Sequence, residues 1–300
     1  MSWDELEKRR TADIVSRRLG VSAKETVFVR DGYELTRHLL QCARQGRSRA
    51  AAIYPADEQE TLNQAVGDSL NGTRPLLLNQ FIRPLRCRYL LQLPGRYGGM
   101  VAELEYLSPE PERARRMAAM EAALSRAAAD IRGAAGPRAP DWARAYAVVE
   151  YAVRHWRYSE DGVWSYTAYG ALVDHAAVCM GISLATLLLM ERMGVPCRYL
   201  HGYRREGNTV GHGWNLIYCG GWFHLDVTDA VTSRDPLRFW GVTALTDRSL
   251  EPGLTLPGPL RCPCPPDFIL QHLRKGTMLW NTLTKNANES TTITRSPCVT

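Results

Sequence analysis

The sequence predicts an α+β protein in which a buried helix packs on an antiparallel sheet, preceded by a small α/β region. Strand-like and helix-like segments alternate through the first third of the chain. Residues 185–190 are apolar on nearly every side, which is typical of a central helix. Three strand-like segments with tight connections follow between residues 197 and 227.

The composition is that of a folded protein. Of 300 residues, 45% are hydrophobic and 23% are charged, which excludes collagen-like, coiled-coil and wholly disordered chains. The net charge of +6 is scattered rather than gathered in a stripe, so we expect no nucleic-acid partner. No segment approaches the ~18 apolar residues of a membrane span, and the N-terminus lacks the apolar core of a signal peptide. We therefore expect a cytoplasmic protein with reduced thiols and no membrane partner.

The first third predicts a small α/β region, residues 1–108, in which we find no chemical motif. An amphipathic helix over residues 1–20 ends at Gly20. Segments rich in β-branched and aromatic residues alternate with further helical patterns. We expect strands at 26–29, 50–54, 86–93 and 100–107, helices at 34–45 and 58–70, and a turn at 95–99.

A second unit, residues 109–281, begins at the proline-rich stretch 108–112. Helices are expected over 113–132 and over 141–155, the second capped by Asp141. From Pro236 onward repeated prolines predict an irregular extension, and residues 282–300 predict a flexible tail.

Cys179 lies where the buried helix is expected to begin, and Gly194 and Pro196 mark its end. Free N–H groups and the positive end of the helix dipole favour a thiolate at that position. A thiolate is the nucleophile of cysteine enzymes. The alternative is that Cys179 is a small buried hydrophobic residue, which is our interpretation of Cys42, Cys87, Cys197 and Cys219.

The strands expected at 197–203, 212–218 and 222–227 bring His212 near Asp226 only in one register. A two-residue loop would pair Asp226 with Asn215 and place it on the wrong face. A three-residue loop, 219–221, pairs 218 with 222 and places Asp226 opposite Trp214, on the face of His212. We predict the three-residue loop.

With that register the three residues have defined roles. Cys179 attacks a carbonyl carbon, His212 exchanges the proton, and Asp226 orients the His212 ring. The rival bases are His175, His201 and His224. We expect His224 to be a packed, hydrogen-bonded neighbour, since it shares a strand face with Asp226.

Three blocks of the sequence resemble the bacterial transglutaminase-like superfamily in their order. They are residues 178–181 (VCMG), 212–215 (HGWN) and 222–228 (WFHLDVT). The resemblance spans about residues 140–230 and includes the approach to the helix, Tyr158 and then residues 166–172. It implies a papain-like core and the catalytic residues Cys179, His212 and Asp226. The chain departs from the family at Asp174-His175 and at Asp229, where a Trp is often found.

The resemblance implies a thioester chemistry that needs no metal or organic cofactor. The expected substrate is an amide of a protein or peptide, most simply cleaved by water, as in a cysteine protease or amidase. Protein crosslinking by a transglutaminase and a non-catalytic interaction module are the alternatives. The backbone N–H of Cys179 is the expected oxyanion donor. Further oxyanion or substrate contacts are expected from Tyr169, Trp164 and Trp214, although both Tyr169 and Trp164 could equally be core aromatics. A zinc site at Cys262 and Cys264 is disfavoured, because the sequence has no second cysteine pair at a workable spacing.

Overall fold

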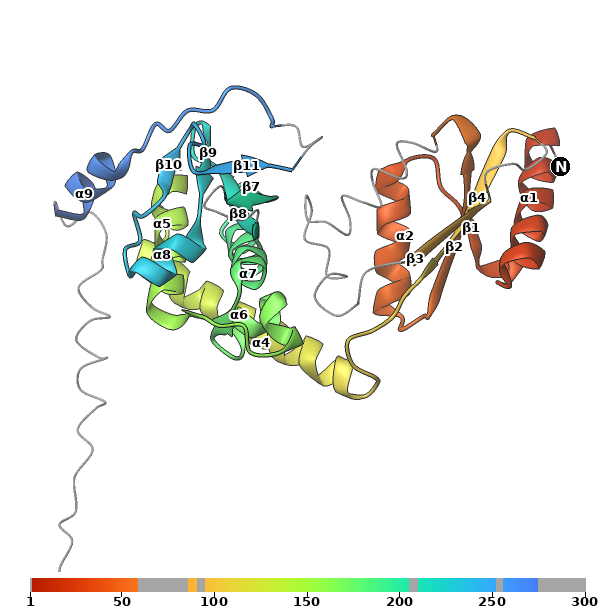
Figure 1. Ribbon diagram of the computed structural model, residues 1–300, viewed down its shortest axis with the longest axis horizontal. Helices are drawn as coiled ribbons and strands as arrows, with labels where there is room; N and C mark the ends of the chain where they lie inside the picture. Colours follow the sequence, from red (N-terminus) through yellow and green to blue (C-terminus); the bar gives the residue numbers. More distant parts are fainter. Residues whose placement is uncertain (1, 59–85, 91–94, 205–209, 252–255, 275–300) are drawn as a thin grey trace, which may run out of the picture.

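The computed structural model describes residues 2–58, 86–90, 95–204, 210–251 and 256–274 (Figure 1). Its helices and strands form an N-terminal sheet with two helices and a second, larger assembly of helices and sheet. The larger assembly confirms the predicted α+β class, because a central helix packs against an antiparallel sheet. The predicted helix at 58–70 and the predicted tail at 282–300 lie outside the described residues.

The N-terminal sheet has four strands in the order β1-β2-β4-β3. The strands are β1 (Thr26–Phe28), β2 (Arg49–Pro55), β3 (Arg86–Leu90) and β4 (Tyr97–Glu103). β1 runs parallel to β2, and the other pairs are antiparallel. β4 begins earlier than predicted, because Tyr97, Gly98 and Gly99 already pair with Pro55, Tyr54 and Ile53 of β2. The predicted turn at 95–99 is therefore shorter.

One helix covers each face of this sheet (Figure 1). α1 (Trp3–Leu19) packs Val15 and Leu19 on Ala51, Ile53 and Val101. α2 (Gly32–Arg44) packs on the alternate residues of the same strands, namely Ala50, Ala52, Tyr54, Met100 and Ala102. This two-residue alternation is the period of a strand whose two faces are both buried. Short 3-10 turns at η1 (Ala23–Glu25) and η2 (Ala56–Glu58) connect the elements.

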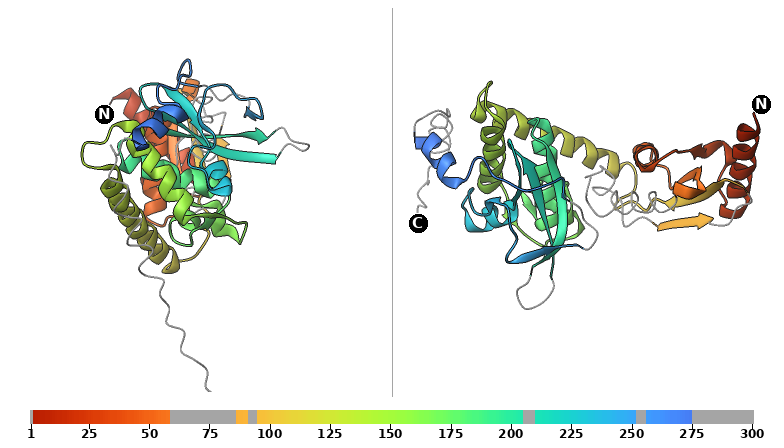
Figure 2. Two further views of the ribbon diagram at one scale, coloured as in Figure 1. Left: turned by 90° about the vertical axis from the view of Figure 1, so that its left-hand side faces the viewer. Right: turned by 90° about the horizontal axis from the view of Figure 1, so that it is seen from above.

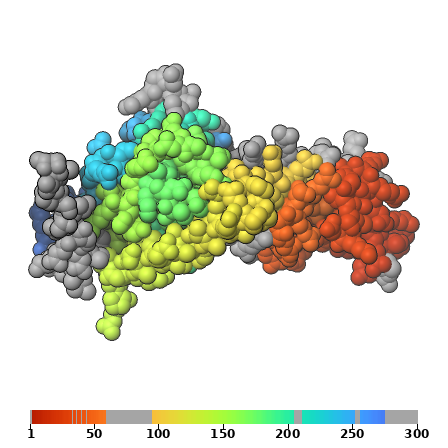
Figure 3. All heavy atoms as spheres, turned by 90° about the horizontal axis from the view of Figure 1, so that it is seen from below, coloured from red at the N-terminus to blue at the C-terminus, as the bar shows by residue number. Residues whose placement is uncertain are grey.

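The second assembly begins with two long helices. α4 (Glu112–Ala135) and α5 (Asp141–His155) match the predicted segments, although α4 continues three residues past Arg132. Asp141 is not the cap of α5. Pro140 occupies the N-cap position, and Asp141 is the first helical residue, paired with Arg144 one turn later. In the space-filling view α4, in yellow, lies between the red and orange N-terminal residues and the green helices (Figure 3).

Four short elements lead from α5 to the central helix α7 (Cys179–Arg192). They are β5 (Arg157–Tyr158), η4 (Val163–Tyr166), α6 (Ala168–Leu172) and β6 (Ala176–Ala177). β5 pairs in parallel with β6, so that Tyr158 lies beside Ala177. α7 is buried from Gly181 to Met190, which confirms the predicted central helix.

The five-stranded sheet has the order β10-β9-β8-β7-β11. Its three central strands are β7 (Cys197–Arg204), β8 (Val210–Tyr218) and β9 (Trp222–Leu225), close to the predicted ranges. The irregular interpretation of the chain after Pro236 is wrong. Two edge strands, β10 (Trp240–Val242) and β11 (Arg248–Leu250), and the helix α9 (Pro266–Arg274) form there. α8 (Val227–Ser233), also unpredicted, follows β9 directly.

The two sheets have separate hydrophobic cores. The apolar residues buried around the N-terminal sheet all precede Tyr106, and those around α7 and the second sheet all follow Met117. In Figures 1 and 2 these two units lie at opposite ends of the molecule. A division into domains at residue 108 stays a prediction. Within the described residues, no helix has both the length and the apolar character that a membrane span requires.

Candidate active site

The segment between β5 and α6 holds the N-terminal end of α7 in place. The Val178 N–H donates to the Ser165 carbonyl at 3.0 Å. A Cβ at Gly181 would collide with the Ser165 and Thr167 carbonyls, so the first turn of α7 packs directly on this backbone. The first helical hydrogen bond runs from the Ile182 N–H to the Val178 carbonyl at 3.0 Å. The N–H groups before it, at the positive end of the helix, face the region of Cys179.

Cys179 is the first residue of α7, and its side chain is half-buried. Burial by itself raises the pKa of this thiol. Hydrogen bonds from the His212 ring and from the backbone at Gly213 and Met180 outweigh burial, and the net pKa lies below its ordinary value. Negative charge on the sulfur is therefore stabilised, as a nucleophilic cysteine requires.

The β8–β9 hairpin has the register that the sequence predicts. Tyr218 pairs with Trp222, and Asn215 pairs with Leu225, which leaves residues 219–221 as the loop. Gly220 has a φ of +78°, a left-handed conformation that glycine adopts without steric cost. This register brings His212 and Asp226 together from neighbouring strands.

His212 Nε2 lies 2.6 Å from Asp226 Oδ2. Because Nε2 is engaged by Asp226, Nδ1 is the ring nitrogen left for the Cys179 sulfur. Burial lowers the pKa of His212, but hydrogen bonds to Asp226 and Cys179 reverse this effect and raise it to about 9. The geometry therefore stabilises an imidazolium on His212 and a thiolate on Cys179 against each other.

Asp226 is fully buried and performs two structural tasks. Its Oδ1 accepts the backbone N–H groups of Thr228 at 2.9 Å and Asp229 at 3.2 Å, and thereby caps α8. Its Oδ2 accepts His212 and a hydrogen bond from the buried Arg248. Burial acts to raise the pKa of Asp226, yet the hydrogen bond and charge of His212, followed by those of Arg248, hold it below its usual value.

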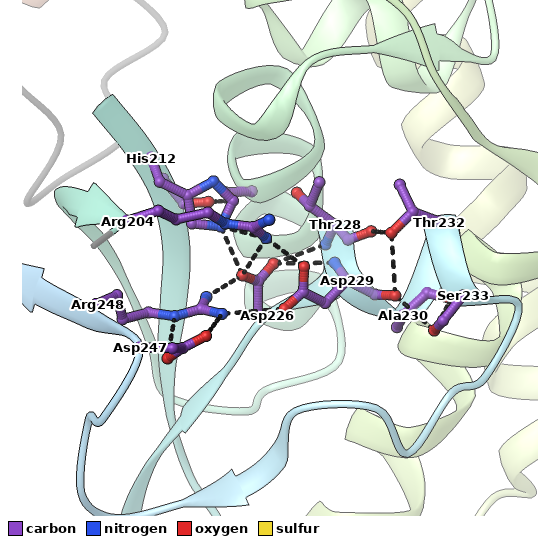
Figure 4. Close-up of polar contacts among 12 residues, drawn as sticks. Arg204, His212, Asp226, Thr228, Asp229, Ala230, Thr232, Ser233, Asp247 and Arg248 are labelled. Atoms are coloured by element: carbon purple, nitrogen blue, oxygen red, sulfur yellow. Dashed lines mark hydrogen bonds and ion pairs between the residues drawn. The ribbon is translucent and has the colours of Figure 1, made fainter. Parts of the chain in front are cut away.

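A second layer of charges surrounds Asp226 (Figure 4). Arg204, at the end of β7, pairs with Asp229 and lies 3.7 Å from Asp226 Oδ2 and 3.4 Å from His212 Nε2. Arg248 also bonds to Asp229 at 3.0 Å and to Asp247 at 2.8 Å. The carboxylate that holds His212 is thus itself held from three further elements.

Comparison with known proteins gives this site a family. The model of the Transglutaminase-like superfamily matches residues 125–227, which include Cys179, His212 and Asp226. Residues 125–227 form a transglutaminase-like domain.

Individual relatives share limited similarity with the chain. A solved structure of a TGase has 14% sequence identity and a TM-score of 0.34, with 60% of this chain and 51% of that chain covered. A candidate cysteine protease from Cytophaga hutchinsonii has 16% identity and a TM-score of 0.31, with 48% and 62% covered. An uncharacterized protein of Mycobacterium leprae (strain TN) is 36% identical over 70 residues, 20% of this chain and 25% of that protein. The chain thus spans about a quarter of the Mycobacterium relative.

The rival histidines lie in other environments within the transglutaminase-like domain and beside it. His224 is buried and accepts the Trp214 indole N–H at 3.1 Å, as predicted for a packed neighbour. Burial, and next the charge of Arg248, lower the pKa of His224 to about 4. His201 Nδ1 lies 3.2 Å from Glu251 Oε2. His175 precedes β6 with a φ of +55°.

The three aromatic candidates have packing positions. Trp214 is fully buried and stacks on the His212 ring with centroids 5.9 Å apart, so it supports His212 from within rather than lining an accessible surface. Trp164 and Tyr169 lie against each other and against the Arg116 guanidinium of α4, at 4.3 Å and 5.0 Å from it. An oxyanion role for either ring stays a prediction.

Sequence reasoning missed Arg204, Arg248 and the function of Asp229. One signal was present: Asp226 followed three residues later by Asp229 is the pattern of a helix N-terminus, and it would have predicted α8. Arg248 gave no signal, because its environment is made by β7, α8 and Phe239, which are distant in sequence.

Tyr158 was not singled out as a site residue, although it lies near Cys179. Tyr158 is 42% exposed. It lies on β5 and pairs with Ala177 of β6, two residues before Cys179. Burial of the hydroxyl and the neighbouring Cys179 raise the pKa of Tyr158 to about 12. Tyr166, 49% exposed, also faces Tyr158. Tyr158 is therefore a partly exposed tyrosine close to Cys179, with Tyr166 as its own neighbour.

Within the described residues, no group of three or more His, Cys, Asp or Glu side chains has a geometry that could hold a metal ion. The arrangement of Cys179, His212 and Asp226 is suited to chemistry that its own side chains supply. A polarised sulfur, an imidazole that can give and take a proton, and free N–H groups at a helix start are the parts needed for acyl transfer.

Proposed function

We propose that the chain is a cysteine hydrolase that cleaves an amide bond of a protein or peptide through a thioester on Cys179. The observation that supports this most strongly is the continuous line from the half-buried sulfur of Cys179 through the His212 ring to the buried carboxylate of Asp226. Accessibility falls along the line, so that substrate reaches the sulfur while the charges that activate it stay out of water.

The reaction begins with attack of the Cys179 thiolate on the carbonyl carbon of the amide. Negative charge develops on the carbonyl oxygen, where the Cys179 N–H and the dipole of α7 stabilise it. His212 gives its Nδ1 proton to the nitrogen that leaves as an amine, and a thioester remains. His212 then takes a proton from water, the hydroxide adds to the thioester, and the acid leaves with the thiolate restored.

Asp226 has no bond-making role in these steps. It keeps the His212 ring in one orientation and stabilises the imidazolium form by its negative charge. Its complete burial makes this interaction stronger than it would be in water, because no solvent competes for Oδ2.

Water and a primary amine are alternative acceptors of the same thioester. We propose water, in keeping with the resemblance to bacterial members of the family. Protein crosslinking remains the second candidate, since both reactions share the acylation step. Hydrolysis and crosslinking differ only in the acceptor of the acyl group, and therefore in the product.

One assay distinguishes these reactions. The chain is incubated with fluorescein-labelled casein and a dansylated primary amine, and acid-soluble fragments and protein-bound dansyl are measured together. We expect fragments from the wild-type chain and at least a thousandfold loss with Cys179→Ala. Dansyl incorporation without fragments would show a transglutaminase instead. Cys197→Ala, which removes a thiol on β7 away from the helix start, is the matched control and should keep activity.

Casein could be a poor substrate, so a second measurement tests the sulfur itself. Iodoacetamide labelling at neutral pH, mapped by mass spectrometry, should modify Cys179 much faster than a simple thiol. A Cys179 that labels no faster than a simple thiol would support a non-catalytic interaction module.

A further inference from the structure

Two arginines face each other across the edge of the second sheet. Arg204 of β7 and Arg248 of β11 are directly paired residues in the antiparallel register. Like charges at directly opposite positions destabilise a sheet. Such a pair is retained only where nearby negative charges compensate it.

Asp229, on the first turn of α8, supplies that compensation to both arginines. Its Oδ1 accepts a hydrogen bond from Arg204, and its Oδ2 accepts one from Arg248 at 3.0 Å. Both arginines also lie on Oδ2 of Asp226. Figure 4 shows the two guanidinium groups converging on the two carboxylates from the sheet side.

Arg248 is fixed more firmly than a surface arginine. Its side chain is fully buried, and its guanidinium lies 3.7 Å from the centroid of the Phe239 ring. Asp247 binds its outer edge through Nε at 3.1 Å and Nη2 at 2.8 Å. Removing a charge from water in this way is costly, and replacing such a network by apolar residues often stabilises a protein. Folding alone does not explain why the network is there.

The charges around His212 balance when the ring is protonated. Three carboxylates, Asp226, Asp229 and Asp247, face two arginines and one imidazolium. The Cys179 thiolate lies on the far side of the His212 ring. The two arginines are thus neutralised by Asp229 and Asp247 together, which leaves the charge of Asp226 to His212.

We propose that Arg248 and Asp229 are positioning residues for the Asp226–His212 pair. Arg248 fixes the Asp226 carboxylate toward Nε2, and Asp229 offsets the charge of the two arginines beside the ring. This inference rests on the proposed function, since it assigns a role toward the same nucleophile.

Among the residues that the structure describes, the charged and titratable groups that face His212 and Cys179 all contribute to the expected shift in the two pKa values. They are Arg204 and Tyr199 of β7, Asp226 and Asp229 at the start of α8, Asp247 and Arg248 at β11, and Tyr158 of β5. Removing the charge of Asp229 leaves one excess positive charge, which favours the thiolate and disfavours the imidazolium. Removing the charge of Arg248 leaves one excess negative charge and acts in the opposite direction.

The test is the pH dependence of Cys179 alkylation by iodoacetamide, measured by peptide mapping, which needs no substrate. The wild-type profile should have two inflections, one for formation of the thiolate and one for loss of the imidazolium proton. In Asp229→Asn both should move down, and in Arg248→Met both should move up, each by roughly half to one pH unit. The double variant should return them toward the wild-type values.

Matched variants separate this effect from damage to the fold. Asp247→Asn removes a carboxylate that is 48% exposed and contacts only Arg248 in the network, so its shift should be smaller than that of Asp229→Asn. Glu121→Gln, which breaks a pair with Arg192 on the surface, should cause none. If Arg248→Met does not fold, Arg248→Lys keeps the charge, so its inflections should stay in place. Because lysine cannot make the bidentate contacts of the Arg248 guanidinium, the alkylation rate of Cys179 should then fall.

The outcomes distinguish the two proposals. Unmoved inflections in folded Asp229→Asn, or shifts of the same sign in Asp229→Asn and Arg248→Met, would overturn the positioning role. A wild-type Cys179 that alkylates like a simple thiol would instead overturn the proposed function.

Discussion

Two networks of ion pairs each join distant parts of this chain, and they differ in exposure. In the N-terminal unit, Asp4 and Glu7 of α1 bind Arg96, beside β4, with the Arg96 side chain 69% exposed. At the candidate active site, Asp226 and Arg248 are fully buried. The first network is solvated and local in its effects. The second lies out of water, where each charge acts strongly on its neighbours.

This difference in burial distinguishes the candidate active site from the N-terminal sheet. Exposed ion pairs contribute little to stability, because water screens them and the side chains lose freedom. Buried pairs are unfavourable to assemble and strongly destabilising when one partner is removed. The N-terminal sheet is built from apolar side chains on both faces, without a buried ion pair among the described residues of its two cores. The second sheet carries such pairs at the residue that orients His212.

The largest effect is expected from Asp226→Asn. The substitution keeps the shape of the side chain but removes the charge that holds His212 and Arg248. We expect turnover to fall by about 10²–10⁴-fold. The free energy of unfolding should fall by about 3–5 kcal/mol, because Arg248 is left buried with one carboxylate fewer. Steady-state kinetics and urea unfolding measure the two quantities. An unchanged free energy of unfolding would contradict the expectation that losing one partner of a buried ion pair is strongly destabilising.

Two buried histidines, one in each unit, extend this comparison to pH, because their pKa values shift in opposite directions. His38, in the N-terminal unit, bonds to the Ala51 carbonyl at 3.1 Å, and burial lowers its pKa. His212 has its pKa raised to about 9 by Asp226 and Cys179 against the effect of burial. In the proposed mechanism the imidazolium of His212 is the active form, and it is lost as the pH rises through about 9.

We therefore expect kcat/KM to fall about tenfold per unit above pH ~9. The lower limb should follow thiolate formation at Cys179. His38→Gln should leave both limbs unchanged, since that ring lies in the other unit. A basic limb near the ordinary value of ~6.5 would contradict the electrostatic account of His212.

The sequence was sufficient for the helix start at Cys179 and for the strand register of His212 and Asp226, because local pattern and register determine both. The apolar run after Cys179 predicts α7, and the face requirement on Asp226 predicts the 219–221 loop, which the structure confirms. Arg248 could not be predicted in this way. It lies on a three-residue edge strand, and Asp247-Arg248-Ser249 resembles a polar surface turn. Only its pairing with β7 and its contact with Phe239 bury it. Similarly, α8 depends on a cap made by the same carboxylate that holds His212.

The smallest effect is expected from Asp4→Asn in the exposed network. Asp4 binds Lys8 at 2.8 Å, Arg96 at 3.3 Å and the Tyr97 hydroxyl, so it has as many charged and polar partners as a residue of the buried network. Contact number alone would predict a substantial loss. Solvent exposure predicts little change in melting temperature and none in turnover, because water replaces the lost contacts and Arg96 stays paired with Glu7 at 3.2 Å. Thermal unfolding at low and at high salt checks this, since an exposed ion pair weakens with salt and the small difference between the two proteins should disappear. A loss as large as that of Asp226→Asn would show that number of partners, and not burial, distinguishes the two networks.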